Sequence, residues 1–409
     1  MFALRRAVPI SLVALSAAWA GGSTSLRFGS DADVRADTIY TNERGYGFDL
    51  GSKAACARNS CSSDQPFFFS VRLPEGNYNV KLTLGDATSA SVTTVKAESR
   101  RLMLEKVETA SGEFVTKTFT VNIRTPRISS GGEVKLKDRE IGVLHWDDKL
   151  TLEFNNRHPA VSAVAITKEE DAVTVYIVGD STVTDQPREP WNSWGQMLPR
   201  FFRPGVAVAN HAESGESLKS SLKARRLDKV LSTIKSGDYL FIQFGHNDQK
   251  ERGEGVGAFT TYKSDLKLYV AEARKRGAIP VLITPVNRRT FDDSGKITNS
   301  LGDYPDAVRQ AAEEENVALM DLNAMSKPFY EALGPENSKK AFVDNTHHNN
   351  YGSYELAKCI VEGIKANKLG IARFLVGDVA PFDPSHPDPI ESFAIPASPL
   401  NTATKPDGN

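Results

Sequence analysis

The sequence is poor in cysteine and histidine, and it carries almost no net charge. Of 409 residues, three are cysteine and seven are histidine, while 50 Lys and Arg nearly balance 51 Asp and Glu for a net charge of −1. Such a balance provides no overall field that would gather nucleic acid or an anionic membrane surface. We therefore expect neither as a partner, and an acidic substrate would have to be met by local cations.

Apolar runs long enough to span a bilayer are also missing. The longest apolar stretch, residues 7–18, follows two arginines and precedes Ala-Trp-Ala at 18–20. This arrangement is typical of a secretory signal peptide. A transmembrane helix is the weaker alternative, because the stretch is shorter than the roughly 20 residues that span a bilayer. We expect residues 1–20 to direct secretion to the extracellular space or periplasm.

Metal ligands at recognised spacings are absent as well. His347 and His348 are adjacent but have no Cys or His partner at ligand spacing, and no HExxH motif occurs. Cys56 and Cys61 lie close together in a polar loop, where an exported protein could form a disulfide. Cys359 lies in a helical pattern typical of a buried apolar residue. We expect no metal and no organic cofactor.

The pattern of apolar residues changes near Ala172, which predicts two domains. Upstream, in residues 21–171, short apolar or alternating runs are separated by Gly- and Pro-containing turns, and helical periodicity is scarce. This pattern is typical of an all-β sandwich. The strands expected from it are 67–73, 78–84, 114–123 and 149–154.

Downstream, in residues 172–379, apolar strands alternate with amphipathic helices, which predicts an α/β domain with a parallel sheet covered on both faces. Residues 380–409 are rich in Pro, Asp, Ser and Thr and predict an extended or disordered tail. The strands expected in the α/β domain are 173–178, 206–210, 239–244, 279–284 and 317–322, and the helices are 218–234, 261–276 and 307–315.

Four polar motifs follow strands of the predicted parallel sheet. Gly-Asp-Ser-Thr at 179–182 comes directly after the first strand, and 212–217 and 244–248 follow the next two. Asp-Asn-Thr-His at 344–347 follows the last strand and precedes a helix. Because ligands bind beyond the carboxyl ends of such strands, we expect all four motifs to meet at one rim.

These motifs contain the groups that ester hydrolysis needs. Ser181 is the candidate nucleophile, His347 the general base, and Asp344 the residue that orients the imidazole. The candidate oxyanion donors are the backbone N–H of Ser181, at the expected start of a helix, the N–H of Gly215, and the side-chain amide of Asn247. Their occurrence together, in order and on one rim, favours a catalytic site over four unrelated turns.

The four motifs resemble those of the SGNH/GDSL hydrolases. The segments 193–197, 241–249, 284–289 and 302–305 make the chain similar to the rhamnogalacturonan acetylesterases over about residues 172–368. The resemblance implies a flavodoxin-like three-layer domain that removes acetyl groups from pectic polysaccharide. Many members of that family have Arg where this chain has Glu216, which puts the choice of polysaccharide in question.

Further candidates surround this site. Trp194, His246 and Arg288 are tentative substrate contacts, although packing or solvation explains each nearly as well. His348 is a rival base, but the spacing from Asp344 favours His347. Alternative functions are an acetylesterase for xylan, another acetylated glycan or a lipid ester, or a catalytically silent glycan-binding protein. The upstream sandwich resembles galactose-binding-like domains, and either sugar binding or simple packing would account for it.

Overall fold

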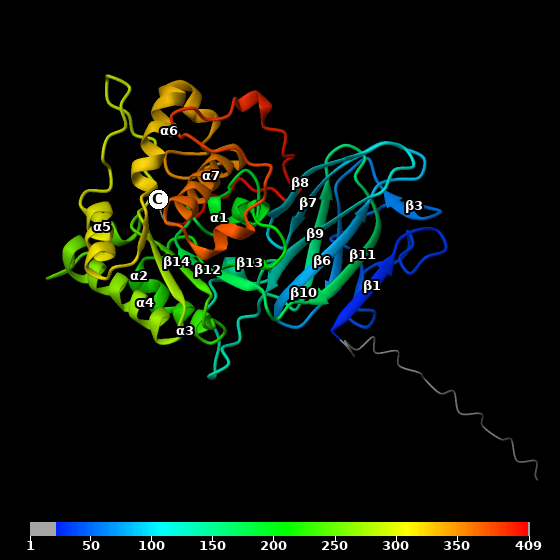
Figure 1. Cartoon of the computed structure of the whole chain (residues 1–409), viewed down its shortest axis with the longest axis horizontal. Helices are drawn as coiled ribbons and strands as arrows, with labels where there is room; N and C mark the ends of the chain where they lie inside the picture. The colour runs from blue at the N-terminus through cyan, green and yellow to red at the C-terminus, as the bar shows by residue number, and fades with distance from the viewer. Residues whose placement is uncertain (1–21, 408–409) are drawn as a thin grey trace, which may run out of the picture.

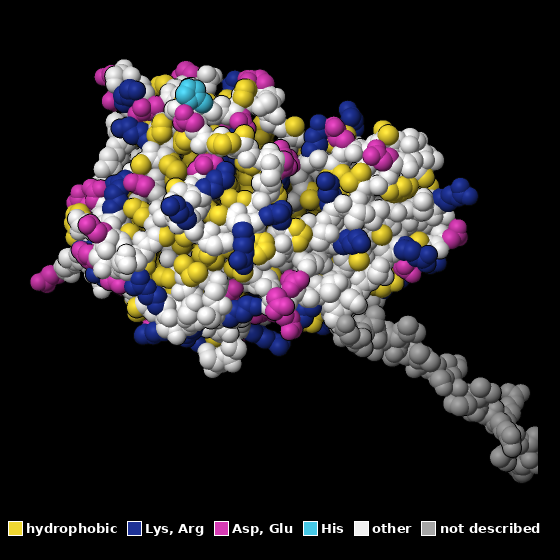
Figure 2. Space-filling model, viewed as in Figure 1, with side chains coloured by type: hydrophobic (Ala, Val, Ile, Leu, Met, Phe, Trp, Pro, Cys, Tyr) yellow, Lys and Arg dark blue, Asp and Glu magenta, His cyan; other side chains and the backbone are white. Residues whose placement is uncertain are grey.

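The computed structural model describes residues 22–407, which form an all-β half and an α/β half lying side by side (Figure 1). The predicted signal peptide, residues 1–20, lies outside the described residues. None of the helices between residues 22 and 407 is both long and apolar enough to cross a membrane. On the face shown in Figure 2, basic and acidic side chains are interspersed over both halves, as the near-zero net charge leads one to expect.

The all-β half consists of two antiparallel sheets that pack face to face around an apolar core. Alternation along β6 shows why these residues form a sandwich, because Tyr78, Val80, Leu82 and Leu84 are all buried while residues between them are more exposed. One sheet contains β1 (Ser23–Arg27), β3 (Ala55–Ala57), β4 (Ser60–Ser62), β6 (Gly76–Leu84), β9 (Val115–Ile123) and β11 (Ala160–Lys168). The other contains β2 (Tyr46–Asp49), β5 (Phe67–Arg72), β7 (Ser91–Ala97), β8 (Arg101–Thr109) and β10 (Lys149–Asn155).

The cysteines behave as the sequence predicts. Cys56 and Cys61 form a disulfide between the paired strands β3 and β4. Cys359 is free and buried, and burial raises the pKa of its thiol.

The α/β half is built on a five-stranded parallel sheet with the order β13-β12-β14-β15-β16. This is the flavodoxin-like order, so the predicted fold is confirmed. The strands are short and apolar on both faces, as expected for a sheet covered on both sides. They are β12 (Val173–Gly179), β13 (Val206–Asn210), β14 (Tyr239–Gln243), β15 (Ile279–Ile283) and β16 (Ala318–Met320).

Two apolar layers of helices cover this sheet. One layer packs against the alternate residues Val175, Ile177 and Phe241, and the other against Tyr176 and Leu240. The first layer contains α1 (Trp194–Met197), α6 (Leu322–Asn337) and α7 (Asn350–Ala366). The second contains α2 (Leu218–Lys223), α3 (Arg226–Leu231), α4 (Lys263–Lys275) and α5 (Tyr304–Glu314).

Two helical predictions differ from the structure. The single helix expected over 218–234 is divided into α2 and α3, because Arg225 between them adopts the left-handed conformation with φ of 63°. Helix α6 was not expected, because Pro328 and Pro335 interrupt its sequence pattern and Gly334 has non-helical torsions within it.

The C-terminal stretch, red in Figure 1, is extended and packs back onto both halves. Leu400 and Thr402 pair through their backbones with Glu189 of the α/β half. On the sandwich, Lys96 donates to the carbonyl of Pro396 over 2.7 Å. Residues 380–407 are therefore largely extended, with one 3-10 turn at Ile390–Ser392.

Buried ion pairs join the two halves. Arg100, in the turn before β8, and Arg101, the first residue of β8, are almost fully buried. Arg101 Nε lies 2.9 Å from the buried carboxylate of Asp185, and Arg100 lies 2.6 Å from Glu189. The expected boundary near Ala172 falls in the turn between β11 and β12, and these ion pairs connect the halves on its two sides.

The pair between Arg101 and Asp185 gives a test of this connection. Arg101→Met should lower the free energy of unfolding by about 3 kcal/mol, because it leaves a buried carboxylate without its nearest cation. Denaturant unfolding measures the change, and Arg157→Met, at an exposed arginine of the sandwich, is the control. Equal stability of the two variants would show that the pair does not couple the halves.

Candidate active site

The candidate nucleophile lies in a tight turn after β12. The carboxylate of Asp180 accepts hydrogen bonds from the N–H and the hydroxyl of Thr182, at 2.9 and 2.8 Å. A side chain at Gly179 would bring its Cβ to 2.5 Å from the carbonyl oxygen of Gln243, so only glycine fits there. Ser181 does not begin a helix, since residues 181–183 form a turn. The expected contribution of a helix dipole at Ser181 is therefore wrong.

The structure brings Ser181, His347 and Asp344 into one hydrogen-bonded chain. His347 Nδ1 lies 2.9 Å from Asp344 Oδ2, and His347 Nε2 lies 2.8 Å from Ser181 Oγ, across 166 positions of sequence. Because the carboxylate requires a proton on Nδ1, Nε2 is free to accept the serine proton.

The carboxylate of this chain is kept ionised. Burial alone would raise the pKa of Asp344, but the hydrogen bond and charge of His347 and the N–H groups of His347 and Thr346 lower it well below its usual range. Asp344 therefore remains an acceptor over the whole range of pH in which an imidazole can act as a base.

Two backbone donors lie at the same rim. Gly215 has a φ of 75°, the left-handed conformation that favours glycine. Within residues 22–407, the N–H groups of Ser181 and Gly215 donate to no protein acceptor. Asn247 uses one N–H of its amide to bond the carbonyl of Glu216 at 3.0 Å, and between residues 22 and 407 its second N–H has no protein acceptor. These are the three donors that the sequence predicts for an oxyanion.

His348, the rival base, faces away from Ser181. Its ring is buried, and Nε2 lies 2.8 Å from the hydroxyl of Tyr330. Burial, with the neighbouring charges of His347 and His246, lowers its pKa to about 3. His348 is thus a neutral part of the core.

The tentative substrate contacts have different environments. Trp194 is fully buried and donates to Gln243 Oε1 at 2.9 Å, so no ring face is exposed for a sugar and this prediction is wrong. His246 is buried and lies 3.3 Å from Asp180, where it supports the nucleophile turn. Arg288 is half-buried beside the carbonyl of His246 and is the one of the three that reaches solvent.

Burial and its neighbours also shape the ionisation of Asp180. Burial opposes the charged form, but the charge and hydrogen bond of His246 and the N–H of Thr182 outweigh burial and lower the pKa.

Among residues 22–407, no three Asp, Glu, His or Cys side chains gather as ligands for a metal ion.

A cavity of about 230 Å³ opens beside the catalytic residues. Gln186 in its wall donates to the carbonyl of Ser181 at 2.9 Å, and the edge of Trp191 meets the ring of His347 with 5.6 Å between centroids. Arg139 and Lys405 also line the cavity, and Lys405 lies 3.4 Å from Asp344. Neither cation has a signal in the sequence, because both lie outside the four motifs and only the folded chain brings them there.

Comparison with known proteins agrees with this geometry. Residues 177–353 match the GDSL-like lipase/acylhydrolase family. Rhamnogalacturonan acetylesterase RhgT of Bacillus subtilis is 42% identical over 221 residues, covering 50% of this chain and 94% of that protein. The chain belongs to the GDSL-like lipase/acylhydrolase family. Its enzyme class within that family is carbohydrate acetylesterase, as the resemblance predicted.

A second relative covers both halves of the chain. YxiM of Bacillus subtilis, an uncharacterized esterase, is 30% identical over 367 residues, covering 83% of this chain and 88% of that protein. The crystal structure of YxiM is 25% identical, with a TM-score of 0.47, and covers 85% of this chain and 99% of that one.

Asp248, the last residue of the third motif, is a buried carboxyl group behind the site. It accepts a hydrogen bond from the N–H of Leu218 at 2.9 Å, and its other oxygen is buried without a hydrogen-bond partner. Burial raises its pKa to about 8. The carboxyl is therefore protonated at neutral pH.

This buried acid predicts a pH dependence of stability. Between its ordinary pKa of 3.8 and about 8, the folded chain binds a proton at Asp248 that the unfolded chain has lost, so stability falls as pH rises through this range. Asp248→Asn should remove this pH dependence. Between pH 5 and pH 9, the free energy of unfolding of the variant should rise by at least about 1 kcal/mol relative to that of the native chain. Thermal unfolding across that range measures the difference, and parallel curves would contradict the assignment.

Proposed function

We propose that the chain is a secreted serine esterase that removes acetyl groups from a pectic polysaccharide of the rhamnogalacturonan type. The observation that carries the proposal is the continuous chain from Ser181 Oγ through His347 to Asp344. The N–H groups of Ser181 and Gly215, which have no acceptor within residues 22–407, lie at the same rim. The expected export signal at residues 1–20 would bring the enzyme to such a polymer.

The first half of the reaction forms an acetyl-enzyme. Ser181 Oγ attacks the acetyl carbonyl carbon while His347 Nε2 takes the hydroxyl proton, and the carbonyl oxygen becomes an anion. The N–H groups of Ser181 and Gly215 and the amide of Asn247 stabilise this anion. Collapse of the intermediate breaks the bond to the sugar oxygen, which receives the proton from His347. The deacetylated sugar then leaves.

The second half repeats these steps with water. His347 Nε2 removes a proton from a water molecule, whose oxygen attacks the acetyl carbon on Ser181. The same donors stabilise the second oxyanion, and its collapse returns the proton to Ser181 Oγ and releases acetate. Asp344 remains ionised throughout and keeps the imidazole in the required tautomer.

The polysaccharide is proposed from two lines of support. The relative RhgT is named a rhamnogalacturonan acetylesterase and covers the catalytic half. Around the site, the half-buried Arg288 and the cavity-lining Lys405 suit a polymer that carries uronate carboxylates, which cationic side chains bind well. Acetylated xylan, whose backbone is neutral, is the second candidate and would not use these charges.

Replacement of the nucleophile tests the reaction and the substrate together. Ser181→Ala should lower acetate release by about a thousandfold or more with folding intact, because no nucleophile remains. The measurement is acetate released from acetylated rhamnogalacturonan and from acetylated xylan, with S181A as the blank. Near-normal release by S181A would contradict the mechanism, and faster release from xylan would contradict the proposed polymer while leaving the esterase in place.

The adjacent histidines provide a matched pair of variants. His347→Ala should resemble S181A in kcat, because it removes the base that contacts Ser181 Oγ. His348→Ala should cost less activity and mainly lower thermal stability, because this ring is buried against Tyr330. Steady-state kinetics with nitrophenyl acetate separates the two. A larger loss of kcat in H348A than in H347A would overturn the assignment of the base.

A further inference from the structure

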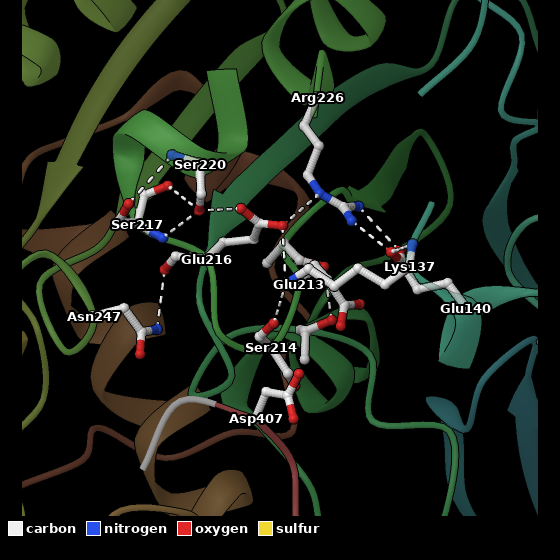
Figure 3. A network of polar contacts seen from close by, with 12 residues as sticks. Lys137, Glu140, Glu213, Ser214, Glu216, Ser217, Ser220, Arg226, Asn247 and Asp407 are labelled. Carbon is white, nitrogen blue, oxygen red and sulfur yellow. Dashed lines mark hydrogen bonds and ion pairs between the residues drawn. The ribbon is translucent and has the colours of Figure 1, made fainter. Parts of the chain in front are cut away.

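The segment between β9 and β10 leaves the sandwich and reaches the rim of the catalytic half. It spans residues 124–148 and contains a short 3-10 helix at Asp138–Glu140. Figure 3 shows Lys137 and Glu140 of this segment beside Glu213, Ser214 and Glu216. A part of the all-β half therefore contacts the loop that carries the oxyanion donor Gly215.

The contact centres on one backbone carbonyl. Lys137 Nζ donates to the carbonyl oxygen of Ser214 over 2.6 Å, and the guanidinium of Arg139 donates to the same oxygen. Arg139 Nε also binds the carboxylate of Glu213 at 2.8 Å. Two cations from the sandwich segment thus share one acceptor on the catalytic loop.

The carbonyl of Ser214 and the N–H of Gly215 belong to the same peptide group. A trans peptide is planar, and its C=O and N–H point in opposite directions. Cations that bind the C=O therefore fix the direction of the N–H on the other side. They also draw electron density toward the oxygen, which makes the N–H a stronger donor, because neighbouring hydrogen bonds polarise one another.

The lysine is itself held in place. Lys137 Nζ lies 3.0 Å from the buried carboxylate of Glu216, and Arg226 Nε lies 3.6 Å from the same carboxylate. Arg226 in turn binds both oxygens of Glu140, whose side chain also accepts the backbone N–H of Lys137 at 2.9 Å. Charge-assisted contacts of this kind leave the ammonium group little freedom.

We infer that Lys137 and Arg139 are positioning residues for ester hydrolysis, which orient and polarise the Gly215 N–H through the carbonyl of Ser214. The inference rests on the proposed function only in requiring esterase chemistry at Ser181, whichever polysaccharide is the substrate. It gives the all-β half a part in catalysis in addition to any binding of sugar. It also accounts for the burial of Glu216, whose carboxylate anchors Lys137.

Kinetics of the full chain on nitrophenyl acetate tests this role. Lys137→Met removes the charge and retains most of the side-chain volume, and we expect kcat to fall by about tenfold to a hundredfold with KM nearly unchanged, since only the transition state bears the oxyanion. Lys137→Arg should recover most of the loss. Lys135→Met, at an exposed lysine two residues earlier, is the control and should retain native kinetics.

A double variant separates positioning from simple neutralisation of Glu216. If Lys137 acts through the Ser214 carbonyl, Lys137→Met combined with Glu216→Gln stays as slow as K137M. Full recovery in the double variant would show that the lysine only balances a buried carboxylate, and would overturn the inference. Arg139→Gln, at a more exposed cation on the same carbonyl, should also lower kcat, and it replaces K137M if that variant does not fold.

Inhibition by an alkyl boronic acid, which adds to the serine as a tetrahedral anion, gives a second readout. The affinity for the boronic acid should fall in K137M by the same factor as kcat. If Lys137 had a purely structural role, the two losses would not match. Native kcat and native boronate affinity in a folded K137M would overturn the inference while the proposed function stands. A native chain that hydrolyses no ester would overturn both.

Discussion

Charges buried between the two halves must be paired, and the form of the active site depends on this constraint. An ion removed from water is costly unless an opposite charge lies close to it. Asp185 and Glu189, in the loop after the nucleophile, are paired by Arg101 and Arg100 of the sandwich. On the other side of the site, Glu216 is paired by Lys137. Residues outside the α/β half therefore contribute to holding the loops on both sides of the catalytic serine.

The same constraint gives the buried carboxyl groups near the site different pKa values. Asp344 is hydrogen-bonded to His347 and keeps a low pKa, so it remains a charged acceptor at the site. Asp248, equally close to the motifs in sequence, is buried without a cation and is protonated at neutral pH. Glu213 is intermediate, because burial and the charge of Glu140 raise its pKa to about 7 although Arg139 binds it. Ionisation thus follows the local pairing and not the residue type.

Sequence patterns predicted the parallel sheet and the convergence of the motifs, because strands buried on both faces read as apolar runs and their carboxyl ends share one rim. They failed where the fold depends on contacts distant in sequence. For Trp194 the sequence left sugar stacking and packing nearly equal, and the ring fills the core beside Gln243. The C-terminal tail has no apolar period, yet Ile395 and Phe393 pack against the core of the α/β half and the backbone pairs with Glu189. The role of Lys137 had no local signal, because its partners lie 77 positions away at Ser214 and beyond.

The central claim is that Ser181 carries the acetyl group during turnover. The most direct measurement is mass spectrometry of peptides from the native enzyme after rapid mixing with an activated acetyl ester and quenching in acid, where the ester bond survives. The account predicts one acetyl group on the peptide that contains Ser181, formed within a single turnover and lost as acetate is released. Turnover with no acetyl group on that peptide, or with the acetyl group on another residue, would contradict the account.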